Sequence, residues 1–167
     1  FFASLALVVV FQPELRRALM RLGETRLFRP LTRQLDQQID ALVESATFLS
    51  KRKIGALVAV EREVGLGGIA ESGALLNAEV TAALLNTIFW PGSALHDLGV
   101  VVQNGRIAAA GVQFPLGDAE GLDRTIGSRH RAAIGLSLDS DAIVVVVSEE
   151  TGSISIAEHG HLHRHIR

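Results

Sequence analysis

Two short, unbroken apolar runs constrain the fold of this chain more than any other feature. They span Ile54 to Val60 and Ala142 to Val147. An apolar run of this length without polar alternation is typical of a strand that is covered on both faces of its sheet. Covering both faces requires helices on either side, so the runs predict an α/β domain with a mixed central β-sheet flanked by helices.

Other strands and helices are expected around these two runs. Asn104-Gly105 joins the strand-like segments 100–103 and 106–114, and this dipeptide is the strongest short signal for a β-hairpin. A last strand is expected over Ser153 to Ala157. Apolar residues at helical spacing predict helices over 31–49, 77–89 and 128–138, with Asn77 and Ser128 as the N-caps of the second and third.

Composition narrows the class of protein. The chain has 167 residues, about the size of one domain, and a formal net charge of −2. This balance argues against a disordered tail, and we expect no nucleic-acid partner. The sequence holds no cysteine, which excludes structural disulfides and thiolate metal sites.

The N-terminal segment has the pattern of a membrane anchor. Residues 1–11 (FFASLALVVVF) are nearly all apolar, and three arginines follow at positions 16, 17 and 21. Because about 20 apolar residues are needed to span a bilayer, we interpret 1–11 as the end of a transmembrane helix whose earlier part is missing. Residues 12–30 would form a juxtamembrane helix and linker, and 31–167 the main domain. The positive-inside rule then places that domain on the cytoplasmic side of the cell membrane. The alternative is an apolar helix that packs on the domain.

Three polar segments carry possible chemistry. His96-Asp97 offers an imidazole and a carboxylate ahead of a strand, although aspartate is also common in turns. Arg129-His130-Arg131 lies at a predicted helix start, where free backbone N–H groups and guanidiniums together suit a phosphate. Ser148-Glu149-Glu150 ends the second apolar run, a position suited to metal ligation. Taken singly, each segment also fits a solvated surface turn. Together they supply what chemistry on a nucleoside triphosphate requires.

Two weaker signals have a simpler interpretation. The segment 65–68 is glycine-rich but lacks the lysine of a phosphate loop, so we expect a flexible loop. Histidines at positions 159, 161, 163 and 165 alternate as if on one face of a strand that could bind metal. A frayed and solvated C-terminus is the favoured interpretation.

Taken in order, these segments resemble the diadenylate cyclase catalytic domain, which makes cyclic di-AMP from two ATP molecules. The resemblance covers nearly the whole chain, including FQPELRRAL (11–19), KRKIGALVAVERE (51–63), LHD (95–97), GSRHRAAIGLS (127–137), VVSEETGSISIA (146–157) and LHR (162–164). The first block is similar to the membrane-anchored branch, in which the domain follows transmembrane helices. The resemblance therefore implies a catalytic domain over 31–167, anchored through N-terminal helices that are not part of this sequence.

The resemblance also implies roles for individual residues. Asp97 matches the aspartate that acts on the ribose 3′-hydroxyl. The implied phosphate and ATP contacts are Leu98, Gly99, Ser128, Arg129, His130, Arg131, Ser148 and Glu149, and the implied adenine region is Gln113, Phe114 and Leu116. His96 and Glu150 match the ligands of a divalent metal, Mg²⁺, Mn²⁺ or Co²⁺. Each subunit resembles half an enzyme, so a face-to-face homodimer is implied, in which each 3′-hydroxyl attacks the α-phosphate of the other ATP.

One departure from the family pattern leaves alternatives open. The family has Asp-Gly-Ala where this chain has Asp97-Leu98-Gly99. If the family glycine has a positive φ, a leucine at that position costs about 1 kcal/mol or more in strain. The chain could then be a nucleotide-binding domain with impaired cyclisation rather than an active cyclase. A membrane-tethered interaction domain without a nucleotide site is the third hypothesis.

Overall fold

The computed structural model describes residues 29–117 and 127–166. The chain divides into two compact units, residues 1–37 and 38–167. The strands and helices of the domain belong to the second unit, except for the first residues of the helix α2 (Arg29–Arg52), which belong to the first unit. The predicted end of a transmembrane helix (1–11) and nearly all of the predicted juxtamembrane segment (12–30) lie outside the described residues. Among the helices that are described, none has the length and apolar character needed to cross a bilayer.

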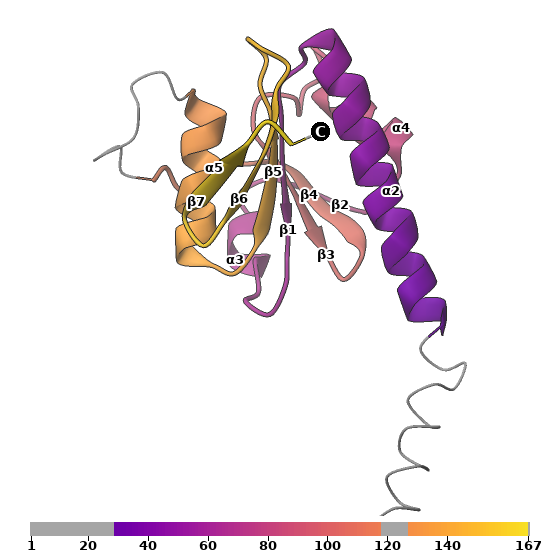
Figure 1. Ribbon diagram of the computed structural model, residues 1–167. Helices are drawn as coiled ribbons and strands as arrows, with labels where there is room; N and C mark the ends of the chain where they lie inside the picture. Colours follow the sequence, from indigo (N-terminus) through magenta and orange to yellow (C-terminus); the bar gives the residue numbers. More distant parts are fainter. Residues whose placement is uncertain (1–28, 118–126, 167) are drawn as a thin grey trace, which may run out of the picture. The chain divides into compact units, whose positions relative to one another are not determined.

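A seven-stranded mixed sheet forms the centre of the domain (Figure 1), and its strand order is β2-β4-β3-β1-β5-β6-β7. The central pair β1 and β3 is parallel, and every other neighbouring pair is antiparallel. The predicted fold class is thereby confirmed. The strands are β1 (Ala56–Val60), β2 (Ala74–Glu79), β3 (Gly99–Gln103), β4 (Arg106–Val112), β5 (Ile143–Val147), β6 (Ile154–Glu158) and β7 (His161–Arg164).

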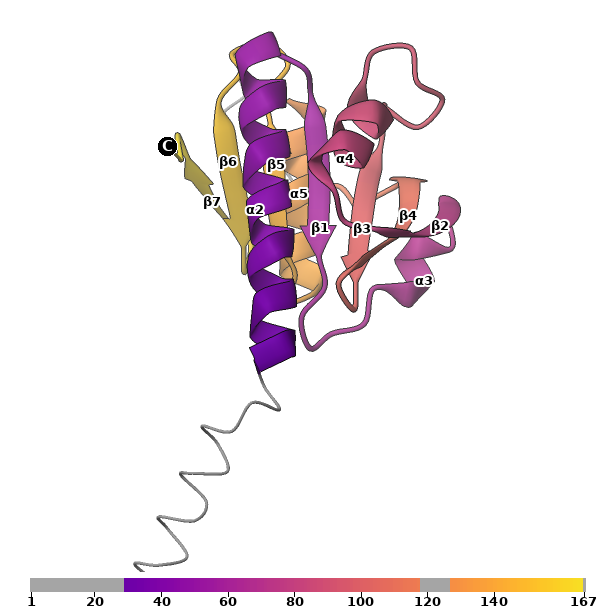
Figure 2. The ribbon, with the colours of Figure 1, turned by 90° about the vertical axis from the view of Figure 1, so that its right-hand side faces the viewer.

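Helices lie on both faces of this sheet (Figure 2). On one face lie α4 (Ala82–Phe89) and, from residue 38 onward, α2 (Arg29–Arg52). On the other lie α3 (Gly67–Ala70) and α5 (Ser128–Asp139). Alternate residues of β1 explain the arrangement, because Leu57 and Ala59 pack in one buried cluster and Ala56 and Val58 in the other. The first apolar run is therefore buried on both faces, as its composition predicts.

The predicted hairpin is present between β3 and β4. Asn104 has φ 47° and Gly105 has φ 73°, the two positive values that a type I′ turn requires. The turn fixes the register of the two strands, in which Gln103 pairs with Arg106.

Both predicted N-caps are wrong. Asn77 lies inside β2 with φ 47°, next to a register irregularity, and Arg106 Nε donates to its side-chain Oδ1 at 2.7 Å. Asparagine tolerates this left-handed conformation, so Asn77 forms part of a β-bulge and does not begin a helix. The cap of α4 is Thr81, whose side chain accepts from the Leu84 N–H. Gly127 occupies the N-cap position of α5, and Ser128 is the first helical residue.

The glycine-rich segment 65–68 is not a loop throughout, contrary to expectation, because Gly67 and Gly68 are the first residues of a helix. It leads into the short helix α3, and Leu66 is buried while its N–H donates to Glu61 Oε2 at 2.6 Å. The preceding residues are held by Asp141, whose carboxylate accepts from the backbone N–H groups of Val64 and Glu63 at 3.0 Å each. These hydrogen bonds lower the pKa of the Asp141 carboxyl.

The C-terminal histidine segment is also more ordered than expected. His161 and His163 belong to β7, which pairs with β6 in antiparallel register. The backbone hydrogen bonds of this edge strand explain why the segment does not fray. No group of three potential metal-ligating side chains is found within the described ranges 29–117 and 127–166.

The cap of α4 can be tested directly. We expect Thr81→Ala to lower the free energy of unfolding by about 1 kcal/mol, because the Leu84 N–H loses its acceptor. Thr87→Ala, on the same helix, is the matched control, since Thr87 only donates back to the Ala83 carbonyl. Denaturant unfolding of the two variants measures the difference, and equal losses would contradict the assignment of the cap.

Candidate functional site

The ends of several strands bring the predicted site residues to one edge of the sheet. The registers Ala56↔Val147 and Gly99↔Val112 place the starts of β1 and β3 beside the ends of β5 and β4. Asp97 and Leu98 directly precede β3, Gln113 directly follows β4, and Ser148 directly follows β5. Segments that are far apart in the sequence therefore meet at this edge, where the N-terminus of α5 also lies (Figure 1).

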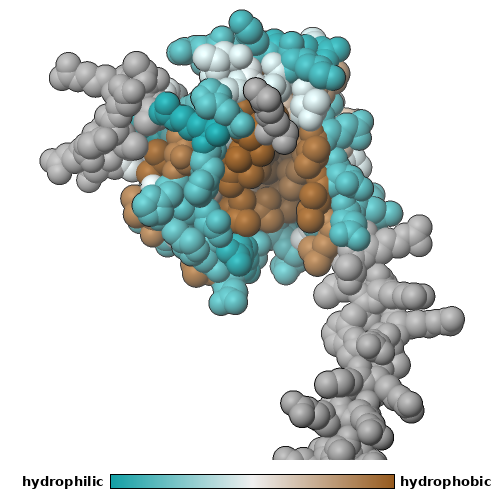
Figure 3. Space-filling model, viewed as in Figure 1, coloured by the Kyte–Doolittle hydropathy of each residue, from teal (hydrophilic) through white to brown (hydrophobic). Residues whose placement is uncertain are grey.

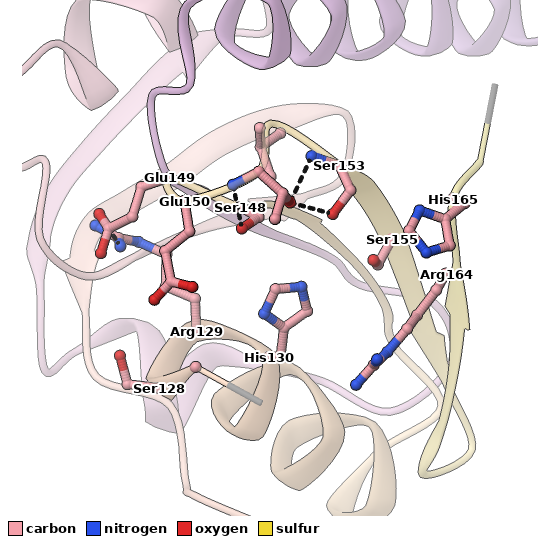
Figure 4. Close-up of a pocket in the computed structure, with 13 residues that line it drawn as sticks. Ser128, Arg129, His130, Ser148, Glu149, Glu150, Ser153, Ser155, Arg164 and His165 are labelled. Atoms are coloured by element: carbon pink, nitrogen blue, oxygen red, sulfur yellow. Dashed lines mark hydrogen bonds and ion pairs between the residues drawn. The ribbon is translucent and has the colours of Figure 1, made fainter. Parts of the chain in front are cut away.

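A cavity of about 280 Å³ opens between the start of α5 and the turn after β5 (Figure 4). Six of the predicted site residues line it, together with residues of β6 and β7 that were not predicted. The lining is Gly127, Ser128, Arg129, His130, Val147, Ser148, Glu149, Glu150, Thr151, Ser153, Ser155, Arg164 and His165. The other predicted residues, His96, Asp97, Leu98, Gly99, Gln113, Phe114, Leu116 and Arg131, do not line it.

Arg129 is fixed in place by an acid and by a glycine. Its Nη1 donates to Glu149 Oε2 at 2.6 Å, and its side chain is largely buried. Gly55 lies directly against the guanidinium, since a Cβ at that position would be 2.7 Å from Arg129 Cζ. A side chain at position 55 would displace the guanidinium from this position, so Gly55 is a site residue that the sequence did not reveal.

Two arginines of this segment keep unused donors. The buried Nε atoms of Arg129 and Arg131 have no hydrogen-bond partner among the described residues. Buried donors without partners are costly, and an anion with oxygen acceptors satisfies them. The Arg131 backbone carbonyl accepts from the Gly117 N–H at 3.0 Å, which ties the segment after β4 to α5.

His130 lies between Glu150 and Arg164 in the cavity (Figure 4). Burial is the main cause that lowers the pKa of its imidazole, and the positive charge of Arg164 lowers it further while Glu150 opposes the shift. The imidazole is therefore biased toward the neutral form, which both donates and accepts a hydrogen bond.

His96 and Asp97 form a second group, outside the cavity. His96 Nδ1 lies 2.5 Å from the Ser93 carbonyl and must donate to it, because a carbonyl only accepts. His96 Nε2 lies 3.1 Å from Asp97 Oδ1, and the Asp97 side chain is 80% exposed. The Ser93 carbonyl thus sets the orientation of the ring, and Nε2 is directed toward the carboxylate. A backbone carbonyl that orients the imidazole in this way is typical of histidine metal ligands.

The predicted strain at Leu98 is absent. Its φ is not positive, and its side chain is exposed. The steric constraint falls on Gly99, where a Cβ would lie 2.5 Å from Phe114 Cζ. Phe114 is buried, and its ring occupies the space that a side chain at position 99 would need. In the predicted adenine region, therefore, only Gln113 and Leu116 are exposed, and Phe114 supplies packing beneath them.

The chain is similar to known proteins over most of its length. The family model described as "DisA bacterial checkpoint controller nucleotide-binding" matches residues 43–162. The chain is 43% identical to the cyclic di-AMP synthase CdaA of Bacillus subtilis and 41% identical to the diadenylate cyclase of Listeria monocytogenes, in each case over 97% of this chain and 61% of the relative. It thus spans about 61% of the length of these relatives.

Solved structures give the same result. A double-cysteine variant of DacA from Staphylococcus aureus has a TM-score of 0.79 and 38% identity, over 81% of this chain and 90% of that chain. A hypothetical membrane-spanning protein from Bacillus cereus has a TM-score of 0.76 and 37% identity, over 96% of this chain and 80% of that chain. The fold and the site define an α/β domain with a mixed sheet and a polar cavity at the ends of its strands. The chain belongs to the DisA-type nucleotide-binding family.

The packing of Gly99 against Phe114 is testable as a coupled pair. We expect Gly99→Ala to lower the free energy of unfolding by about 1–3 kcal/mol, because the new methyl group overpacks against the ring. Combining it with Phe114→Leu should recover part of that loss, as a double-mutant cycle would measure. Gly68→Ala is the control, since a Cβ there meets nothing within 4 Å. Strict additivity of the two substitutions would argue against the contact.

The lowered pKa of His130 predicts how stability depends on pH. Protonation favours the unfolded state, where the imidazole pKa is close to the ordinary value of 6.5. The lowered pKa therefore contributes to the free energy of unfolding at a pH above 6.5. This contribution is lost as the pH falls from 6.5 toward the lower pKa of the folded state. Between pH 8 and pH 5, His130→Gln should lose less stability than the parent chain in denaturant titrations. Parallel curves for the two proteins would show that His130 is not the group responsible.

Proposed function

We propose that this chain is the catalytic domain of a diadenylate cyclase, which condenses two ATP molecules into cyclic di-AMP and two pyrophosphates. The observation that carries the proposal is the division of the site into two groups at one sheet edge. The cavity beside α5 presents arginines and hydroxyls suited to phosphate, whereas the Asp97 carboxylate lies outside it and is exposed. The relatives named diadenylate cyclase and cyclic di-AMP synthase support this activity.

The cavity is suited to hold the triphosphate. Arg129 lines the cavity and keeps a buried Nε donor without a partner among the described residues, and Ser128 and Ser148 add hydroxyl groups at the cavity wall. Arg131, two residues further along α5, has a buried Nε donor without a partner as well, but it does not line the cavity. Glu149 holds the Arg129 guanidinium in its orientation. We place the adenine beside Gln113 and Leu116, over the buried ring of Phe114, where backbone groups of the segment would contact it.

Asp97 is the group we assign to the ribose 3′-hydroxyl. Because it does not line the cavity of its own chain, it is suited to act in a face-to-face homodimer. In each half-reaction the 3′-oxygen forms a bond to the α-phosphorus of the opposite ATP, and the bond from that phosphorus to pyrophosphate breaks. The hydroxyl proton passes to the Asp97 carboxylate. Two such reactions close the ring.

His96 and Glu150 are the residues we assign to a divalent metal, Mg²⁺, Mn²⁺ or Co²⁺. The orientation of His96 by the Ser93 carbonyl and the carboxylate beside its Nε2 fit a cation at this position. When bound, a divalent ion would stabilise negative charge on the reacting phosphate and on the leaving pyrophosphate. Phosphate oxygens would complete the coordination.

The membrane location is part of the proposal. The apolar residues 1–11 and the arginines that follow them would anchor the chain, with the catalytic domain on the cytoplasmic side. The similarity to a protein described as membrane-spanning supports an anchor.

Leu98 favours a second candidate, a nucleotide-binding domain of the same family with impaired cyclisation. Its side chain is exposed, and it directly follows Asp97, the residue that we assign to the reaction with the opposite subunit. A bulky group at this position could hold the two ATP molecules apart without affecting the binding of either.

Turnover separates these candidates. With ATP and Mg²⁺, Mn²⁺ or Co²⁺, we expect the chain to release cyclic di-AMP, which mass spectrometry detects. Asp97→Asn should reduce the rate at least about 100-fold, because it removes the base from the reacting hydroxyl. Calorimetry should show that this variant binds ATP as tightly as the parent chain.

ATP binding and product formation together distinguish the cyclase, the nucleotide-binding domain and the interaction domain. ATP binding without product from the parent chain, together with product from Leu98→Gly, would establish the second candidate. The absence of ATP binding in the parent chain and in Asp97→Asn would exclude both candidates and favour an interaction domain.

A further inference from the structure

The far wall of the cavity is made by β6 and β7, which contribute Ser155 and Arg164. The two residues are directly paired in the antiparallel register of these strands. Both line the cavity whose near wall is the start of α5 (Figure 4). None of the proposed ATP contacts among the described residues lies on this wall.

Ser155 carries a hydroxyl without a partner. The residue is 1% exposed, and its Oγ makes no hydrogen bond to any described residue. Figure 4 shows this oxygen on the cavity side of β6. A buried hydroxyl is normally satisfied, so an orphan one that faces a polar cavity indicates a ligand atom.

Arg164 carries a charge that is not neutralised. Arg129 on the opposite side of the cavity is paired with Glu149, whereas Arg164 makes no ion pair within residues 29–117 and 127–166. In Figure 4 its guanidinium extends from β7 toward His130. Its charge also reaches that imidazole, since Arg164 contributes to lowering the pKa of His130.

We propose that Ser155 and Arg164 form a binding subsite for the terminal β- and γ-phosphates of the nucleotide, the part that leaves as pyrophosphate. This inference rests on the proposed function and assigns a second wall to the same site. His130 lies between Arg129 and Arg164, so the cationic groups are spread across the cavity. An extended polyphosphate fits this spread of charge better than a single phosphate does.

The subsite also gives Arg164 a role in the chemistry. A guanidinium at the terminal phosphates stabilises the negative charge that develops on the leaving pyrophosphate. The hydroxyl of Ser155 donates to the same group and gains the partner that it lacks in the free protein.

Equilibrium binding to the full chain tests the subsite at Arg164. In an Asp97→Asn background, which prevents turnover, Arg164→Gln should weaken the binding of ATP and of inorganic pyrophosphate by about tenfold or more. AMP, which lacks the terminal phosphates, should bind within about twofold of the parent affinity. Arg62→Gln is the matched control, because Arg62 pairs with Glu158 outside the cavity and should change neither affinity.

Ser155→Ala supplies a readout that a purely structural role would not give. We expect it to weaken pyrophosphate binding several-fold while the melting temperature of the ligand-free protein stays the same or rises, because an unsatisfied buried hydroxyl is removed. A lower melting temperature with unchanged pyrophosphate affinity would overturn the assignment of Ser155.

Two results would overturn the subsite as a whole. One is an equal loss of ATP and AMP affinity in Arg164→Gln, and the other is an unchanged affinity for pyrophosphate. Failure of the proposed cyclase activity is distinguishable from failure of the subsite. In that case the parent chain would bind ATP in an Arg164-dependent manner without forming cyclic di-AMP.

Discussion

The pairing of β1 with both β3 and β5 is the constraint on which the rest of the structure depends. β1 runs parallel to β3 and antiparallel to β5, so the start of β1 lies beside the start of one neighbour and the end of the other. The site segments are attached at these strand ends. Because both faces of β1 are packed against helices, a shift in its register would expose core residues, and the position of the site is fixed by the core.

Close backbone packing then adjusts the site within this frame. Gly55 admits the Arg129 guanidinium, and Gly99 admits the ring of Phe114. At Gly135 the chain passes so close to the backbone of residues 115–117 that no side chain would fit. In each case the absence of a side chain allows two segments of the chain to approach closely.

The cavity is electrostatically incomplete by itself. Its lining includes the Arg129 Nε donor and the Ser155 hydroxyl, both buried and without a partner among the described residues, and an imidazole biased toward the neutral form. The two unsatisfied polar groups are costly when they have no partner, and the oxygen atoms of a polyanion would satisfy them. The carboxylate of Asp97 lies outside the cavity, and this separation is the reason that the proposed reaction requires a second subunit.

The sequence by itself determined the mixed α/β class, the Asn104-Gly105 hairpin and the polar segments of the site, because these depend on local composition and periodicity. It did not determine where α4 begins, because Asn77 belongs to β2, which forms by pairing with the distant strand β4. It also did not determine the conformation before segment 65–68, where the distant Asp141 holds the backbone of Glu63 and Val64. The same holds for Gly55, Ser155 and Arg164. Their roles depend on which strands become neighbours, and only the tertiary structure decided that.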